Sequence, residues 1–176
     1  MAEPLDPESQ RIRGYLIAQA ARLTIPELIE KVRTDSLQLW EAASEIPRNR
    51  LGERPGAEDW SAEEVLNHVL LMTENGVNAI TGILSSGAVP PRITDTMLPG
   101  GRTGFASAAD YRAAFEALRT PLYAVVSAAE GHEHPDVKIT HPQFGGFTWR
   151  EWFLFMRVHD LDHMRQLQSN AAAFNA

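Results

Sequence analysis

The sequence predicts an all-α protein, a four-helix bundle with a further short helix at its N-terminus. Four segments begin with a capping box, in which an N-cap Ser or Thr is followed three positions later by an acid. The boxes are Thr24 with Glu27, Ser61 with Glu64, Ser107 with Asp110, and Thr148 with Glu151. After each box, apolar residues recur at helical spacing, and no segment predicts a strand of convincing length. Four amphipathic helices without a sheet bury their apolar stripes against one another.

The bounds of the helices follow from these signals in order along the chain. Residues 7–22, within an N-terminal extension 1–22, predict the short helix. The bundle helices are expected at 24–46, 61–84, 107–131 and 148–173. Pro26 suits a first helical turn, where its missing N–H has no intrahelical partner. We expect Gly131 to end the third helix and Pro121 to kink it. The links between the helices are 47–60, 85–106 and 131–147. Each link is long enough to cross the length of the bundle, so the sequence does not determine the order in which the helices pack.

Size, charge and composition limit the classes of function. At 176 residues, the chain is expected to form a single helical domain over residues 1–176. It contains no cysteine, so any metal must be held by histidine and carboxylate. The formal net charge of −7, without a basic cluster, argues against a nucleic-acid partner. No apolar run is long enough to span a bilayer, and the acidic N-terminus is unlike a signal peptide. We therefore expect a soluble cytoplasmic protein.

Three histidines within the predicted helices form a candidate metal site. His159 and His163 are four residues apart on one helix, so both rings project from the same face. His68 stands among apolar residues of another helix and could supply a third nitrogen. Three neutral imidazoles suit a divalent metal such as Zn, Ni, Fe or Mn and leave coordination positions open, as in catalytic sites. An isolated histidine pair at this spacing often lies only on the polar side of a helix and binds no metal. The aromatic residues before this pair favour rings that face the interior of the bundle.

Other polar residues near these histidines have competing, structural explanations. Glu64 lies one turn before His68, but its capping box already accounts for it. Asp160 and Asp162 could each fix the tautomer of a neighbouring imidazole, and we interpret Asp160 as facing solvent. The remaining histidines, in the loop before the last helix, are His132, His134 and His141. The first two are expected in a solvated turn, and the role of the third stays open.

The motifs of several familiar enzyme classes are missing. Asp160 follows His159, whereas a zincin protease carries a glutamate directly after its first histidine. The sequence has no nucleophile elbow and no dinucleotide-binding fingerprint. The glycines of residues 98–104 have neither a strand before them nor a lysine placed for phosphate, so they predict a turn.

Two segments, 59–69 and 141–167, closely resemble the DinB-like superfamily of damage-inducible proteins and thiol transferases. In that family a tryptophan-led helix carries the first metal histidine, which His68 matches. The family's later motif, His-x-x-x-His followed by Gln-Leu, is matched by His159, His163, Gln166 and Leu167. The resemblance implies a bundle in up-down-down-up order, a divalent metal on the three histidines and, frequently, a homodimer.

The resemblance leaves three functions open. Family members of known chemistry include metal-dependent transferases and isomerases that use mycothiol, bacillithiol or glutathione. The first expectation is therefore a thiol S-transferase-like enzyme whose metal activates a cosubstrate thiol, which agrees with a chain that lacks cysteine. In that enzyme the 85–106 loop would help to shape the substrate cleft. The second is a metal-dependent hydrolase that uses a metal-bound hydroxide, with Glu64 or Asp162 relaying the proton. The third is a non-catalytic, stress-related metal-binding bundle.

The expected partners are a small-molecule substrate and a second copy of the chain, with no nucleic acid and no membrane. Ile12, Tyr15 and Leu16 in the N-terminal segment are apolar, and a complete four-helix core does not need them. We therefore expect them to cover a neighbour's surface in a homodimer.

Overall fold

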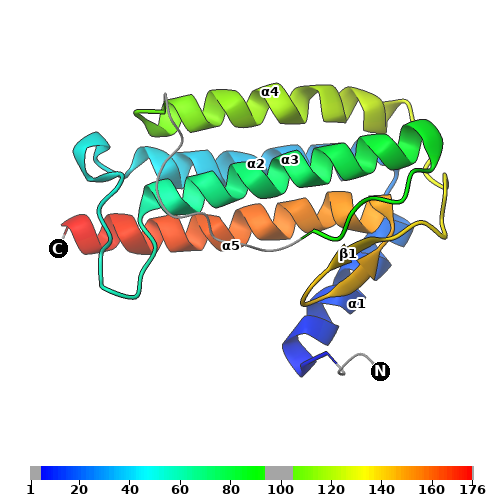
Figure 1. Cartoon of the computed structure of the whole chain (residues 1–176), viewed down its shortest axis with the longest axis horizontal. Coiled ribbons are helices and arrows are strands. Elements are labelled where there is room, and N and C mark those ends of the chain that lie inside the picture. The colour runs from blue at the N-terminus through cyan, green and yellow to red at the C-terminus, as the bar shows by residue number, and fades with distance from the viewer. Residues whose placement is uncertain (1–4, 94–104, 176) are drawn as a thin grey trace.

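The computed structural model describes residues 5–93 and 105–175, and it confirms the all-α prediction (Figure 1). The helices are α1 Pro7–Arg22, α2 Ile25–Ser44, α3 Ala62–Ser86, α4 Ala108–Ser127 and α5 Trp149–Asn175, with a 3-10 turn η1 at Arg48–Arg50. The short N-terminal helix has the predicted bounds. Within the described part of the chain, no helix is long and apolar enough to cross a membrane.

The four long helices form a bundle in the up-down-down-up order. In Figure 1, α2 and α5 run in one direction and α3 and α4 run in the other. α5 packs against α2 and α3, and α4 covers the same two helices from the other side. α3 therefore ends at the end of the bundle opposite to the one where α4 begins. This arrangement places α3 beside α5, the two helices that carry the candidate metal histidines.

The predicted capping boxes start the four long helices. The hydroxyls of Thr24 and Ser61 accept N–H groups from the acids three positions on, whose carboxylates accept the N-cap N–H groups in return. Thr148 and Glu151 make the same pair of hydrogen bonds. The third box differs in detail, because its Asp110 carboxylate accepts from the backbone of the residue before the cap. These local hydrogen bonds are why the N-terminal boundaries were predictable from sequence.

The C-terminal boundaries differ from the predictions. α3 runs to Ser86, and the left-handed Gly87 (φ 66°) follows it as the C-terminal cap. α4 continues through Pro121 but ends at Ser127, so the prediction that Gly131 ends this helix is wrong. Gly131 instead lies in a separate turn, where the Glu133 carboxylate accepts its backbone N–H at 2.9 Å. Its positive φ of 99° serves that turn.

A small β-hairpin lies before α5, and its two strands are too short to contradict the expectation that no strand of convincing length forms. Strand β1, Ile139–His141, pairs antiparallel with β2, Gly145–Phe147. Strands of three residues are too short to show the alternation that identifies a strand in sequence. The side chain of Arg13 donates to the carbonyls of Phe144 and Gly146, which attaches the hairpin to α1.

α1 belongs to the core of its own chain. Leu16 is 0% exposed and packs in one hydrophobic cluster with α2, α3 and the aromatic residues of α5. Arg150 of α5 donates to the carbonyls of Ala20 and Leu23 and so fixes the end of α1. The expectation that Leu16 is spare apolar surface is therefore wrong.

Candidate metal centre

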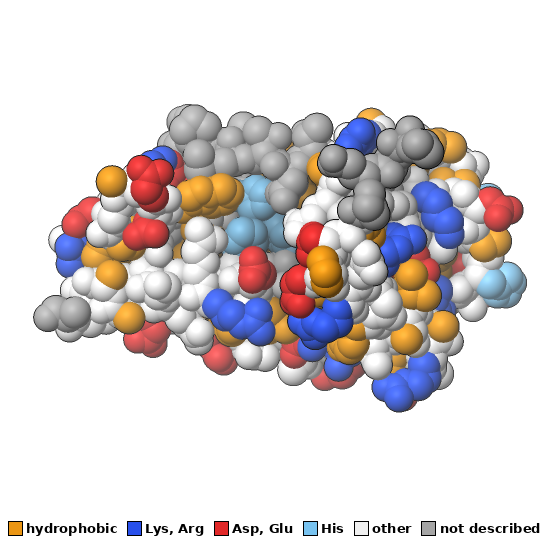
Figure 2. Space-filling model, turned by 90° about the horizontal axis from the view of Figure 1, so that it is seen from below, with side chains coloured by type: hydrophobic (Ala, Val, Ile, Leu, Met, Phe, Trp, Pro, Cys, Tyr) orange, Lys and Arg blue, Asp and Glu red, His pale blue; other side chains and the backbone are white. Residues whose placement is uncertain are grey.

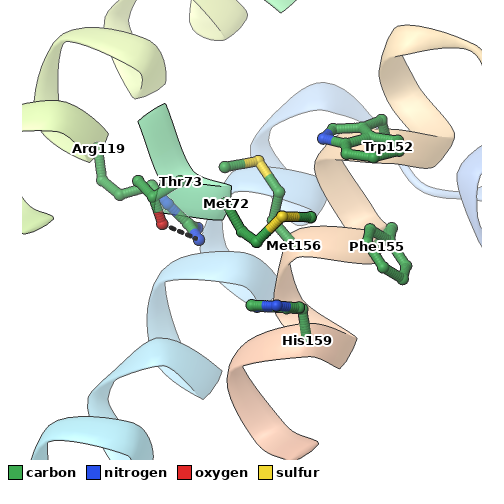
Figure 3. Close-up of a pocket in the computed structure, with 7 residues that line it drawn as sticks. All are labelled: Met72, Thr73, Arg119, Trp152, Phe155, Met156 and His159. Atoms are coloured by element: carbon green, nitrogen blue, oxygen red, sulfur yellow. Dashed lines mark hydrogen bonds between the residues drawn. The ribbon is translucent and has the colours of Figure 1, made fainter. Parts of the chain in front are cut away.

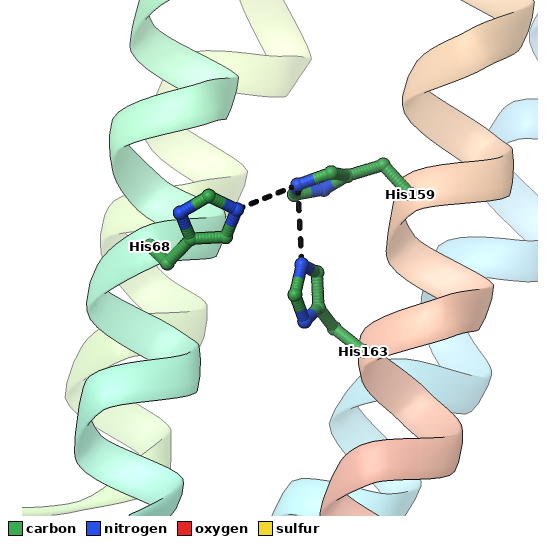
Figure 4. A group of neighbouring side chains, drawn as sticks. All are labelled: His68, His159 and His163. Atoms are coloured by element: carbon green, nitrogen blue, oxygen red, sulfur yellow. Dashed lines mark hydrogen bonds between the residues drawn. The ribbon is translucent and has the colours of Figure 1, made fainter. Parts of the chain in front are cut away.

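The imidazole rings of the three predicted histidines converge between α3 and α5 (Figure 4). The Nε2 atom of His159 lies 3.1 Å from Nε2 of His68 and 3.2 Å from Nε2 of His163. One ligand nitrogen from each ring can be chosen so that all three lie within 4.8 Å of one another. Nitrogens bound to one ion at about 2.0–2.1 Å are themselves about 3 Å or slightly more apart, so this donor set fits a divalent transition metal. The predicted clustering of these residues is confirmed.

Neighbouring side chains fix the orientation of two of the rings. The Nδ1 atom of His163 lies 2.9 Å from the Oε1 atom of Gln166, one helical turn further along α5. If Nδ1–H donates to this amide oxygen, the tautomer that results directs the Nε2 lone pair toward the cluster. The indole of Trp60 contacts His68 edge-on and stacks on His163, with ring centroids 5.4 and 6.4 Å apart. Asn170 donates to the carbonyl of Trp60 at 2.9 Å and holds this residue against α5.

The electrostatic surroundings keep the central histidine neutral. Burial lowers the pKa of His159 well below its ordinary value of 6.5, and the nearby imidazoles of His163 and His68 and the charge of Arg119 lower it further. A histidine must be neutral at its coordinating nitrogen to bind a metal. The lowered pKa therefore favours the neutral ring that metal coordination requires.

A layer of polar side chains, one from each bundle helix, lies next to the cluster. Asp160 of α5 is 0% exposed, and both of its carboxylate oxygens lie 3.1–3.2 Å from Nη2 of Arg119 on α4. The hydroxyl of Ser36 on α2 is 2.9 Å from the same carboxylate, and Thr73 on α3 accepts from Arg119 at 3.4 Å. Burial raises the pKa of Asp160, and the Arg119 charge opposes that rise.

The interpretation that Asp160 faces solvent is therefore wrong. Its partners Ser36 and Arg119 are 124 and 41 positions away in the sequence, so no local pattern predicts them. A signal was nevertheless present on α4. Arg119 stands at helical spacing between the buried Phe115 and Leu122, and a charged residue in an apolar stripe requires a buried partner.

The carboxylates considered for proton transfer are engaged elsewhere or exposed. Glu64 completes its capping box and accepts from the Arg54 guanidinium at 2.5 and 3.0 Å. The hydrogen bond from Arg54 lowers the pKa of Glu64 below its ordinary value of 4.5, against the effect of burial. Asp162 faces solvent, with 77% of its side chain exposed, near Arg165.

The remaining histidines lie outside the cluster. His141 is buried on β1, and its Nδ1 accepts the backbone N–H groups of Gln143 and Phe144, so it holds the turn of the hairpin. His132 and His134 are exposed, which confirms the predicted solvated turn.

Histidine side chains reach the surface in the middle of one face of the molecule, with hydrophobic and acidic side chains nearby (Figure 2). Half of the 85–106 loop that is expected to shape a cleft, residues 94–104, lies outside the described residues.

Comparison with known families agrees with the fold and the cluster. The sequence profile of the DinB superfamily matches residues 28–167, a range that contains nearly all of the four-helix bundle and the three clustered histidines and leaves out α1. A search of curated proteins finds no significant match. Because the profile covers most of the chain, the protein belongs to the DinB superfamily.

Proposed function

We propose that His68, His159 and His163 bind one divalent metal ion, Zn, Ni, Fe or Mn, and that the protein is a thiol S-transferase-like enzyme. The observation that carries the proposal is the convergence of three Nε2 atoms, with separations of 3.1 and 3.2 Å. Family membership supports it, and so does the donor set of three imidazoles without a protein carboxylate.

When bound, the metal would supply positive charge that favours the thiolate form of a cosubstrate thiol, such as mycothiol, bacillithiol or glutathione. The chain contains no cysteine, so a sulfur nucleophile has to come from a second small molecule. Trp60 and Phe155 place apolar rings against the imidazoles, which restricts water around them. Gln166 orients His163, and Trp60 packs on both His68 and His163. The site is thus organised by side chains that do not themselves react.

The hydrolase alternative has less support. Its proton relay was assigned to Glu64 or Asp162, and the first is paired with Arg54 while the second faces solvent. A non-catalytic metal-binding bundle is the other alternative, and turnover distinguishes it from an enzyme.

The proposal is tested first by metal content and then by turnover. Anomalous scattering measured at several absorption edges should place one ion between the three rings and identify its element. Conjugation of a chlorinated aromatic electrophile with each of the three thiols should be faster with the metal-loaded protein than after chelator treatment.

Variants separate the metal site from general damage to the fold. His159→Ala and His163→Ala each leave two imidazoles and should abolish both metal binding and the metal-dependent rate. His132→Ala, at an exposed position, is the matched control and should retain both. Metal-dependent hydrolysis of an activated ester, without acceleration of any of the three conjugations, would replace the transferase proposal with the hydrolase.

We also keep the homodimer and the cytoplasmic location as predictions. Tyr15 and Ile17 on α1 remain 39% and 38% exposed and are available to a second copy of the chain. Sedimentation should give about twice the chain mass of 19.5 kDa. A single species at the mass of one chain at high micromolar concentration would contradict the dimer.

A further inference from the structure

A small cavity lies directly beside the histidine cluster, inside the bundle (Figure 3). Its volume is about 10 Å³, which is room for about one water-sized group. The residues around it are Met72 and Thr73 of α3, Arg119 of α4, and Trp152, Phe155, Met156 and His159 of α5. One wall is therefore a ring of the candidate metal site.

The polar atoms around this cavity are mainly hydrogen-bond donors. Among the described residues, Nε and Nη1 of Arg119 and Nε1 of Trp152 are buried without a hydrogen-bond partner. Arg119 is only 2% exposed and Trp152 only 1%. The Thr73 hydroxyl already accepts from Arg119, and methionine sulfur is a weak acceptor. Buried donors without partners are costly and rare, so an acceptor oxygen in this cavity would stabilise the site.

The charges around the cavity favour an uncharged acceptor over an anion. The guanidinium of Arg119 is already matched by the Asp160 carboxylate, at 3.1–3.2 Å from both oxygens. An anion would lose its hydration and lie close to that carboxylate without a surplus positive charge to compensate. A carbonyl oxygen accepts the same hydrogen bonds without this cost.

Two methionines line the cavity, close to a tight contact between α3 and α5. A methyl group added at Gly76 of α3 would lie 2.9 Å from Nε1 of Trp152, so the close approach of this helix depends on glycine. Met72 and Met156 both line the cavity together with Trp152 and Arg119 (Figure 3). Methionine side chains are unbranched and rotate easily, so they can move aside for an entering group.

We propose that this cavity is a subsite for one uncharged hydrogen-bond acceptor, the carbonyl oxygen of the electrophilic substrate, held by Arg119 and Trp152 beside the histidine cluster. The identification of the occupant as a substrate rests on the proposed function. Binding of a carbonyl compound in the cavity requires neither turnover nor metal, so the two proposals fail separately.

The test uses acetamide and acetate, which are nearly equal in size and differ in charge. The full-length protein is titrated with each compound, both as purified and after chelator treatment. Binding is followed in the nuclear magnetic resonance spectrum through the indole N–H of Trp152 and the methyl groups of Met72 and Met156. The chain has four tryptophans and five methionines, so these signals can be assigned by substitution. We expect saturable shifts with acetamide, with a dissociation constant on the order of millimolar for so small a ligand.

Variants assign the effect to the two donors. Arg119→Lys keeps a positive charge for Asp160 but removes the guanidinium donors, and should weaken acetamide binding about tenfold or more. Trp152→Phe removes the N–H and keeps an aromatic ring, and should weaken it about fivefold, as followed at Met156. Arg157→Lys is the matched control, because Arg157 is a partly buried partner of Asp35 away from the cavity. It should bind acetamide as the parent protein does.

Three results would overturn the proposal. One is the absence of saturable shifts at Trp152 and the two methionines, including a cavity that exchanges only water. Another is equal or tighter binding of acetate. The third is a loss of acetamide binding in Arg157→Lys as large as in Arg119→Lys.

Discussion

Replacing Arg119 with Met is expected to destabilise the protein by about 3–5 kcal/mol. The reason is the environment of Asp160, which is 0% exposed and has the Arg119 guanidinium as its cation, with Nη2 at 3.1 and 3.2 Å from its oxygens. Methionine fills a similar volume but leaves the carboxylate with the Ser36 hydroxyl as its one remaining partner in this layer. For a chain of this size the cost corresponds to a decrease of about 6–20 °C in the melting temperature.

A double-mutant cycle separates the ion pair from packing. Asp160→Leu alone leaves the buried guanidinium without its carboxylate and should lower the free energy of unfolding by a similar amount. The double variant Arg119→Met with Asp160→Leu should have a free energy of unfolding within about 1 kcal/mol of that of the parent, or higher. Urea unfolding, followed by far-ultraviolet circular dichroism, measures all four proteins. Arg112→Met is the control, since the Arg112–Glu116 pair is about half exposed and should contribute less than about 0.5 kcal/mol.

Additive effects in this cycle would refute the reasoning, because a buried pair must show a coupling energy. The reasoning would also be refuted if each single variant lowered the free energy of unfolding by less than about 1 kcal/mol. An unpaired charge in the bundle core destabilises a protein by more than that.

Three further predictions concern the cluster and the cap of α3. Gln166→Leu removes the acceptor on His163 Nδ1 and should weaken metal binding about 10- to 100-fold by calorimetry, while Gln168→Leu on the exposed face should not change it. Metal affinity should fall as the pH drops below about 6, because protons compete for the imidazole nitrogens; a flat profile from pH 8 to 5 would exclude imidazole ligation. The pKa of Glu64 is lowered in the fold below 4.5, so its stabilisation is present above that pH and is lost as the pH falls through the lowered pKa. The free energy of unfolding, measured as a function of pH in the acid range, should depend less on pH in Glu64→Gln than in the parent. If the two profiles are the same, the pair with Arg54 contributes nothing to stability.

Features that depend on neighbouring residues in the chain could be predicted from the sequence. The N-terminal boundaries of the long helices rest on hydrogen bonds between residues three positions apart, such as Ser61 with Glu64. The histidine pair on α5 is equally local. His68 could be added because it stands in an apolar stripe and matches a family motif.

Features that depend on distant partners could not be predicted. The sequence around Asp160 predicts an exposed side chain, because its partner Arg119 is on another helix and no neighbouring residue distinguishes a buried aspartate from an exposed one. Gly131 predicts the end of α4 because glycine is the commonest residue after a helix, but its backbone N–H instead donates to the Glu133 carboxylate in a separate turn. The packing order also came from the family resemblance and not from residue patterns.

The polar layer of Ser36, Thr73, Arg119 and Asp160 also sets the axial alignment of the helices. An apolar interface can slide by one helical turn, about 5.4 Å, and still bury its surface, whereas a layer containing one ion pair and two hydroxyls is satisfied at a single alignment. Thr73 is five positions from His68 on α3, and Asp160 directly follows His159 on α5. The alignment that satisfies the layer is therefore the same one that brings the rings together. Folding of the chain alone thus organises the three nitrogens, and the metal ion that we propose would not have to rearrange the bundle.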